Sequence, residues 1–252
     1  MNKYSVLTYI LNDYEPVREI NYDISLSQNV EFVLVTDNPN LTSNTWKIVY
    51  DPEFNNPKYT IYDKLMYIRY HPFKYVSNDI CFKIDGSMQI NKPLDYFIDY
   101  FIENEYDGTA LLHPLRDTIY DEYRAWNILK NMPWEEIYTH YKRIDDFLNY
   151  DYEIRGIYLV GFSIVRNNDM QNIIDKCVYN MIKFNGHCTK LDQTFYSCFI
   201  NTHFLNTKWL ILSNEILNGE YISMFYHNSD IQVIQPHIGE YIFRNEIVEP
   251  FY

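Results

Sequence analysis

Glycine is scarce in this chain, with 7 residues in 252, and none of them lies between residues 8 and 18. That segment also holds a single basic residue, Arg18. A nucleotidyltransferase usually holds its triphosphate with a glycine-rich, basic loop near the N-terminus. The sequence therefore argues against this class, which stays an alternative because it too places a metal-binding carboxylate after a strand.

Basic residues are outnumbered, with 21 Lys and Arg against 34 Asp and Glu and a formal charge of −13. Sequence-independent binding of DNA or RNA needs clustered Lys and Arg, and so does docking on anionic membranes by charge. No run of 18 apolar residues occurs, and the first ten residues lack the pattern of a signal peptide. We expect no nucleic-acid partner and no transmembrane segment.

Cysteine is also rare, with four residues at Cys81, Cys177, Cys188 and Cys198. They form no Cys-x-x-Cys pair, and their spacing does not suggest a zinc site. With reduced thiols and no targeting segment, we expect a soluble, cytoplasmic protein.

Aromatic residues are abundant, making up 18% of the chain, and 47% of all residues are apolar. This composition is typical of a globular protein large enough to bury a substantial core. Aromatic rings fill cores, but they also stack on sugar faces and on uracil. Both interpretations of the aromatic excess are open at this point.

Apolar runs that end at turn residues alternate with segments of helical spacing. Strands are expected at Tyr4–Ile10, Val30–Thr36, Trp46–Tyr50, Asp79–Ile84, Gly108–Leu112, Gly156–Val165, Lys208–Leu212, Tyr221–Tyr226 and Ile231–Ile234. Helices are expected at Tyr59–Tyr70, Pro93–Asn104, Asp117–Lys130, Trp134–Tyr150, Asn168–Phe184 and Lys190–Thr202. This alternation predicts an α/β fold with a mostly parallel central sheet and helices on both faces. We expect one domain over 1–252, with a nucleotide-binding half to about residue 115 and an acceptor half after it.

The segment Cys81–Ile90 carries the clearest chemical signal. An apolar strand there delivers Asp85 at its carboxyl end, and Gly86 leaves room for a ligand near the backbone. A carboxylate in this place can hold a divalent cation, which in turn can hold a diphosphate. The alternative is an ordinary Asp-Gly turn.

Several short motifs recur in order along the chain. They are Asn12–Pro16, Thr36-Asp37, Trp46, Lys64, Ile84–Gly86, His113–Arg116 with Asp121-Glu122, Gly161–Arg166 and Asp192-Gln193. Together they resemble the glycosyltransferase-like domain family of the plant TOD1/MUCI-type proteins and many bacterial polysaccharide loci, over about residues 3–200. More distantly, the chain resembles glycogenin-like transferases of the GT-A fold.

This resemblance implies a GT-A-like enzyme that moves a hexose from a nucleoside-diphosphate sugar, preferably a UDP-sugar, to a glycan acceptor with Mn²⁺ or Mg²⁺. It favours a retaining outcome. It implies that Asp192 grips sugar hydroxyls and that Gln193 faces the anomeric carbon. It also implies Tyr9 and Asp37 as base or ribose contacts, and a late histidine, His237 with His227 as the alternative, as a metal ligand beside Asp85.

The chain departs from the family at the Asp-x-Asp motif, since position 83 is Lys and position 87 is Ser. Lys83 and Asp85 share one side of the strand, so Lys83 can neutralise phosphate or pair with Asp85. Lys64 is the preferred partner of Asp85 or of the diphosphate, whereas Arg69 on the same helix is expected to be solvated. The reduced motif keeps open a non-catalytic carbohydrate-binding or scaffold protein on this fold.

The loop after the strand at 108–112 contributes His113 and Arg116 as donor-binding candidates. Arg116 suits bidentate contact with phosphate or with a sugar carboxylate. Its alternative is a structural pair with Asp117, Asp121 or Glu122. Asp121 and Glu122 are in turn either acceptor-side bases or the solvated first turn of a helix.

Overall fold

The central sheet has seven strands, six of which run parallel to one another. Their spatial order is β10-β6-β7-β4-β1-β2-β3, and β7 runs antiparallel to both of its neighbours. The computed structural model describes residues 4–113, 116–151, 156–203, 208–212, 214–225, 227 and 229–230. Within them the seven strands are β1 Tyr4–Ile10, β2 Val30–Thr36, β3 Lys47–Tyr50, β4 Ile80–Ile84, β6 Gly108–Leu111, β7 Phe162–Arg166 and β10 Trp209–Leu212.

Helices cover both faces of this sheet, because its central strands are largely apolar and buried on both sides. On one face, Leu7 of β1 and Val33 of β2 pack with Ile68 of α1 (Ile61–Tyr70). On the other face, Phe82 of β4 packs with Ile98 of α2 (Asp95–Glu103). These contacts confirm the predicted α/β class with a mostly parallel sheet.

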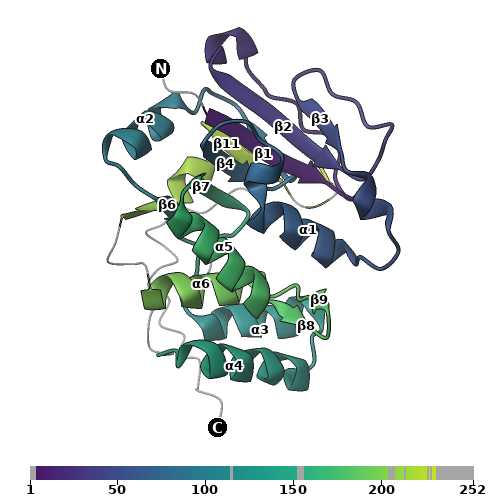
Figure 1. Ribbon diagram of the computed structural model, residues 1–252, viewed down its shortest axis with the longest axis vertical. Helices are drawn as coiled ribbons and strands as arrows, with labels where there is room; N and C mark the ends of the chain where they lie inside the picture. Colours follow the sequence, from purple (N-terminus) through teal and green to yellow (C-terminus); the bar gives the residue numbers. More distant parts are fainter. Residues whose placement is uncertain are drawn as a thin grey trace.

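The remaining helices build a second layer on the α1 side of the sheet. They are α3 Ile119–Lys130, α4 Trp134–Leu148, α5 Asp169–Met181 and α6 Asp192–His203. Helix α5 contacts α1 and α6, and α4 contacts α3, α5 and α6; Figure 1 shows this group stacked below the sheet. No helix among the described residues has the length and apolar character needed to cross a membrane.

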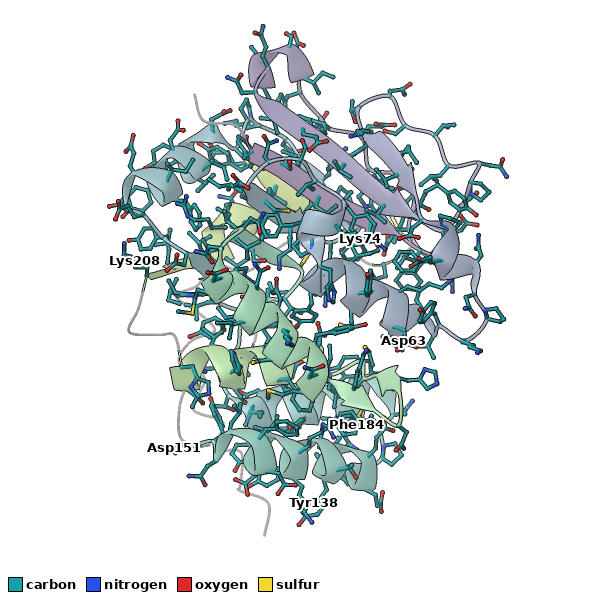
Figure 2. All side chains as sticks on the ribbon, viewed as in Figure 1. Asp63, Lys74, Tyr138, Asp151, Phe184 and Lys208 are labelled. Carbon is teal, nitrogen blue, oxygen red and sulfur yellow. The ribbon has the colours of Figure 1, made fainter. Side chains whose placement is uncertain are left out.

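A hairpin of β8 (Lys183–Phe184) and β9 (His187–Cys188) joins this layer to α1. Asp63 accepts hydrogen bonds from Thr60 in a capping box at the start of α1 and from the Cys188 backbone N–H. Figure 2 shows Asp63 and Phe184 on the two sides of this junction. The same carboxylate therefore starts a helix and anchors the hairpin.

Several boundaries differ from the sequence prediction. The helix expected to reach Phe184 ends at Met181, because Asn185 and Gly186 both take positive φ and form the two-residue turn of the hairpin. Strand β5 (Met88–Ile90) was not predicted, whereas its antiparallel partner β11 (Ile222–Met224) lies within the strand expected at Tyr221–Tyr226. The strand expected over Gly156–Val165 is shorter and begins at Phe162. The strand predicted at Ile231–Ile234 lies outside the described residues.

The topology places the ends of four strands at one edge of the sheet. Strands β1, β2, β4 and β6 all finish there, and antiparallel β7 begins there, with the Asp85 N–H donating to the Gly161 carbonyl at 2.8 Å. In open α/β sheets, ligands bind at this edge.

Candidate active site

A cavity of about 510 Å³ opens at this edge of the sheet. Its wall is assembled from segments that are far apart in sequence. The lining residues discussed below are Tyr9, Tyr14, Glu15, Tyr62, Arg69, Asp85, Gly86, Ser87, Arg116, Glu122, Trp126, Gly161, Lys190, Asp192, Gln193 and His227. The cavity thus unites many of the candidates from both halves of the chain.

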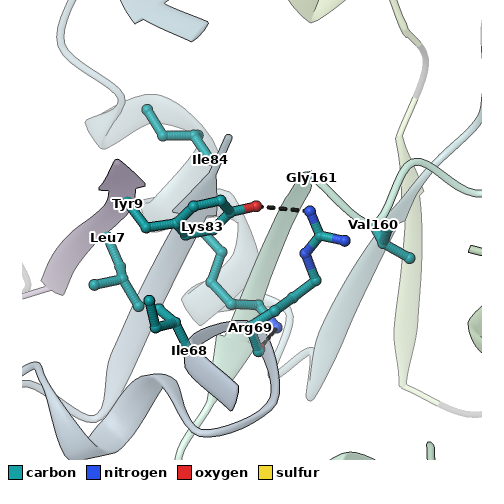
Figure 3. A pocket seen from close by; sticks show the side chains of 8 residues that line it. All are labelled: Leu7, Tyr9, Ile68, Arg69, Lys83, Ile84, Val160 and Gly161. Carbon is teal, nitrogen blue, oxygen red and sulfur yellow. Dashed lines mark hydrogen bonds between the residues drawn. The ribbon is translucent and has the colours of Figure 1, made fainter. Parts of the chain in front are cut away.

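At the floor of the cavity, one guanidinium joins two carboxylates. Arg69, in the last turn of α1, donates from NH2 to Asp85 Oδ1 at 2.8 Å and from NH1 to Asp192 Oδ2 at 2.5 Å. NH2 also donates to the Tyr9 hydroxyl at 2.6 Å, as Figure 3 shows, and that hydroxyl hydrogen-bonds to Asp85 Oδ1 as well. The expectation that Arg69 is merely solvated was wrong, since its side chain is 8% exposed.

The charges of this cluster depend on one another. Burial raises the pKa of the Asp192 carboxyl, and Arg69 opposes that rise. Burial alone would lower the pKa of Arg69, but Tyr9, Asp192 and Asp85 outweigh it and raise that pKa well above its usual value. Burial likewise raises the pKa of Tyr9. The guanidinium is therefore a permanent cation, and the Tyr9 hydroxyl keeps its proton.

Two glycines allow the chain to pack closely around Asp85. A Cβ added at Gly161 would overlap the Asp85 carboxylate, so the residue before β7 has to lack a side chain. A Cβ at Gly86 would stand 2.6 Å from the Tyr9 carbonyl oxygen. The carboxylate consequently packs directly against backbone, which limits the directions in which it can turn.

Lys83 lies behind the cluster and, among the described residues, forms no ion pair with Asp85 or with another carboxylate of the cavity wall. Its Nζ donates to the Arg69 carbonyl at 3.1 Å, and burial lowers its pKa (Figure 3). The largest opposing influence on this pKa is the charge of Asp175 of α5, whose own pKa burial raises to about 7. Lys83 therefore secures the C-terminal end of α1 and faces away from the wide part of the cavity.

Lys64 and Asp37 pair with each other and not with Asp85. Lys64 Nζ donates to Asp37 Oδ2 at 2.7 Å and to Asn12 Oδ1 at 2.9 Å, and the Asn12 backbone N–H donates to Asp37 Oδ1. Asn12 has positive φ, so this pair stabilises the turn that follows β1. The preferred Lys64–Asp85 pair was wrong, and neither Lys64 nor Asp37 is in the cavity wall. Their proposed nucleotide contacts stay a prediction.

Arg116 pairs with Glu122 across the start of α3. Glu122 is 2% exposed and also accepts from the Trp126 indole N–H at 2.8 Å. Asp121 caps α3 in a capping box with Thr118, so it is a structural residue. His113 lies outside the wall, and burial together with Arg116 lowers its pKa to about 3.

Gln193 and Lys190 lie at the start of α6, beside Asp192. Both side chains are half-buried and line the cavity. The Lys190 ammonium lies 5.5 Å from the centre of the Trp126 ring, within range of a cation–π interaction. Sequence reasoning placed Gln193 correctly in this wall but missed Lys190.

His227, the alternative to His237 as a late metal ligand, lies at the rim of the cavity. His227 Nδ1 is 2.6 Å from Glu15 Oε1, and its ring lies against Tyr14. Arg18 holds the same segment by donating to the Ser229 carbonyl at 2.6 Å. His237 lies outside the described residues. The chain near residue 227 therefore closes the cavity on the β1 side.

A divalent cation takes about six oxygen ligands with carboxylates among them. Within the described residues, no group of three or more His, Cys, Asp or Glu side chains is placed to hold a metal ion. Asp85 Oδ1 is already bonded to Arg69 and Tyr9, and Ser87 takes the second position of the Asp-x-Asp motif. The donor set that the structure describes does not fit a resident divalent cation.

Comparison with protein-family models and with the sequences of curated proteins gave no match. Among solved structures, the apo form of mouse xyloside xylosyltransferase 1 is similar to this chain, with a TM-score of 0.46 and 9% sequence identity. The match covers 84% of this chain and 85% of that chain. The fold class itself rests on the strand order and the two helical layers described above.

Arg69 is the main functional candidate that sequence reasoning missed. In the sequence it is an ordinary basic residue near the end of an amphipathic helix. The available signal was its position among neighbours of α1 that are themselves buried, Ile68 and Tyr70. Its partner Asp192 follows 123 residues later, so no local pattern reveals the pair.

Proposed function

We propose that this chain is a glycosyltransferase that moves a hexose from a nucleoside-diphosphate sugar to a glycan acceptor. The observation that carries the proposal is the convergence of Asp85, Asp192 and Gln193 on one cavity at the carboxyl ends of parallel strands. Carboxylates and amides recognise sugar hydroxyls by hydrogen bonds. A volume of about 510 Å³ lies within the common range for small-molecule sites, roughly 300–1,000 Å³.

Aromatic side chains suit the rest of such a donor. Tyr14 and Tyr62 are partly exposed at the rim, and Trp126 lies on the opposite wall. Rings of this kind stack on a nucleobase or on the apolar face of a sugar. Lys190 brings positive charge to the same wall, which supports binding of a diphosphate.

The roles of the residues follow from their burial. Asp192 is fixed by Arg69 and is proposed to accept hydrogen bonds from sugar hydroxyls. Gln193, the next residue, carries no charge and is proposed to face the anomeric carbon. A UDP-sugar as donor, a retaining outcome and membership of the TOD1/MUCI-type family belong to this proposal.

A panel of nucleotide sugars tests the proposal. Purified protein is incubated with each donor, with and without Mn²⁺, and nucleoside diphosphate release is measured. Release from at least one donor, increased by a glycan acceptor, supports the proposal. Absence of release from every donor, with no thermal stabilisation by any nucleoside diphosphate, contradicts it.

Gln193→Ala separates a catalytic role from a merely structural one. We expect kcat to fall by at least about tenfold with little change in donor KM, because the proposed contact is to the reacting carbon. The matched control is Gln28→Ala, which truncates an exposed glutamine outside the cavity wall. Equal kcat values for the two variants would refute the role of Gln193.

A further inference from the structure

We propose that this site holds its donor diphosphate with side-chain cations and not with a divalent metal. Arg69 takes the place of the metal between Asp85 and Asp192, and Lys190 supplies the positive charge that remains for the phosphates. This inference rests on the proposed function, because it specifies how that function's substrate is bound.

The first argument is the position of the guanidinium. A metal at this strand end would need oxygens from Asp85 at roughly 2.0–2.6 Å. Asp85 Oδ1 instead accepts from Arg69 NH2 at 2.8 Å, and the same guanidinium reaches Asp192 at 2.5 Å. A dication on Asp85 would therefore lie within a few ångströms of a permanent cation, in a partly buried place where the repulsion is screened less than in bulk water.

The second argument is that Arg69 is held in place. Its side chain is 8% exposed, and its backbone carbonyl accepts from the buried Lys83. If the guanidinium turned away from Asp85, it would also separate from Asp192, whose side chain is 5% exposed. A buried carboxylate left without its partner is strongly unfavourable, so metal entry by displacement of Arg69 is opposed.

The third argument is the restricted position of Asp85. Its carboxylate packs against Gly161 so closely that no side chain fits there. Two residues further on, the chain offers the hydroxyl of Ser87, which carries no charge. Asp85 is thus suited to a fixed partner, and the guanidinium is that partner.

The last argument concerns the charge left over for a diphosphate. Among the residues that the structure describes, four carboxylates and three lysine or arginine side chains line the cavity. Arg69 is shared by Asp85 and Asp192, and Arg116 is paired with Glu122. Lys190 forms no ion pair with any described residue and lies over the Trp126 ring. Among the described basic residues that line the cavity, Lys190 therefore has a charge that is available to bind phosphate.

Calorimetry with UDP as the ligand tests the inference. We measure its Kd in excess EDTA and again in millimolar Mn²⁺. The expected result is the same Kd within about twofold, because no metal joins the complex. UDP binding that appears only with Mn²⁺ would overturn the inference and leave the proposed function standing. If UDP and the other nucleoside diphosphates bind under neither condition, the proposed function fails and the inference fails with it.

A lysine variant tests the second half of the inference. Lys190→Met should weaken UDP binding by about tenfold or more in EDTA, which corresponds to the loss of one charge-assisted contact. The matched control is Lys176→Met, which removes an exposed lysine of α5 outside the cavity wall. Equal affinities for these two variants would overturn the assignment of Lys190.

Mn²⁺ alone gives a readout that needs no nucleotide. Electron paramagnetic resonance of free Mn²⁺ should show no site that depends on Asp85. A single bound Mn²⁺ that is lost in Asp85→Asn, while the melting temperature is unchanged, would overturn the inference directly.

Discussion

Replacing Arg69 with methionine removes the guanidinium while keeping a long apolar side chain. The change leaves Asp192 buried with no cation, and Asp85 with only the Tyr9 hydroxyl. Asp85 is 25% exposed and can be hydrated, but Asp192 is 5% exposed and cannot. We therefore expect most of the cost to come from Asp192.

The expected loss of unfolding free energy is that of breaking a buried ion pair, about 3–5 kcal/mol. For a chain of this size, that corresponds to a fall in melting temperature of roughly 6–20 °C. Burial already raises the pKa of Asp192 with Arg69 present, so without Arg69 the carboxyl should bind a proton more readily still. The loss should therefore be larger at pH 8 than at pH 5, because acid favours the uncharged form of Asp192.

Urea unfolding followed by circular dichroism at both pH values measures this loss. The control is Arg69→Met combined with Asp192→Asn, which removes the stranded charge and should recover a large part of the stability. A loss below about 1 kcal/mol at pH 8, or no recovery in the double variant, would refute the claim that Arg69 compensates a buried carboxylate.

Two further predictions concern single positions. Gly161→Ala should displace the Asp85 carboxylate, with a loss of about 1–3 kcal/mol in unfolding free energy and weaker nucleotide binding in calorimetry; unchanged UDP affinity would contradict the packing described above. His140 of α4 is 5% exposed, and burial, aided by Arg143 and Lys190, lowers its pKa to about 4. The unfolded chain binds this proton near pH 6.5 and the folded chain does not, so wild-type stability should fall as the pH drops from 6.5 to 4, by up to roughly 3 kcal/mol. The His140→Gln variant should lose less unfolding free energy than the wild type over the same pH range, as measured by urea titration. An equal dependence of unfolding free energy on pH in the two proteins would show that His140 is not responsible.

Much of the sheet could be predicted because the local sequence of each strand, an apolar run near turn residues, indicates where it lies. Strands β1 and β2 have the bounds that the sequence predicts, since both are mostly apolar runs with polar turn residues soon after them. The direction of β7 carries no such mark, because a buried strand has the same composition whichever way it runs. The β8–β9 hairpin did have a signal, Asn185-Gly186, which the helical spacing before it outweighed.

Site residues could be predicted from the sequence where they lie at the end of a strand or the start of a helix. They could not be predicted where their role depends on a partner far away in the sequence. Asp85, at the end of β4, and Asp192-Gln193, at the start of α6, were found and do line the cavity. Lys64 and Arg69 lie on one helix and have similar chemistry. Only the three-dimensional arrangement decides which of them meets Asp85, and it brings in Arg69.

The pairing of Arg69 with Asp192 also constrains the order in which parts of the protein can fold during synthesis. The two residues leave the exit tunnel 123 positions apart, a delay of about 6–25 s at ordinary rates of translation. Throughout that interval the guanidinium of Arg69 has no carboxylate of α6 with which to pair. Exposure to water is then more favourable for this charge than burial. We therefore expect the last turn of α1 to settle against the sheet only after α6 has emerged, so that a nascent chain carries an unfinished cavity until its final third is made.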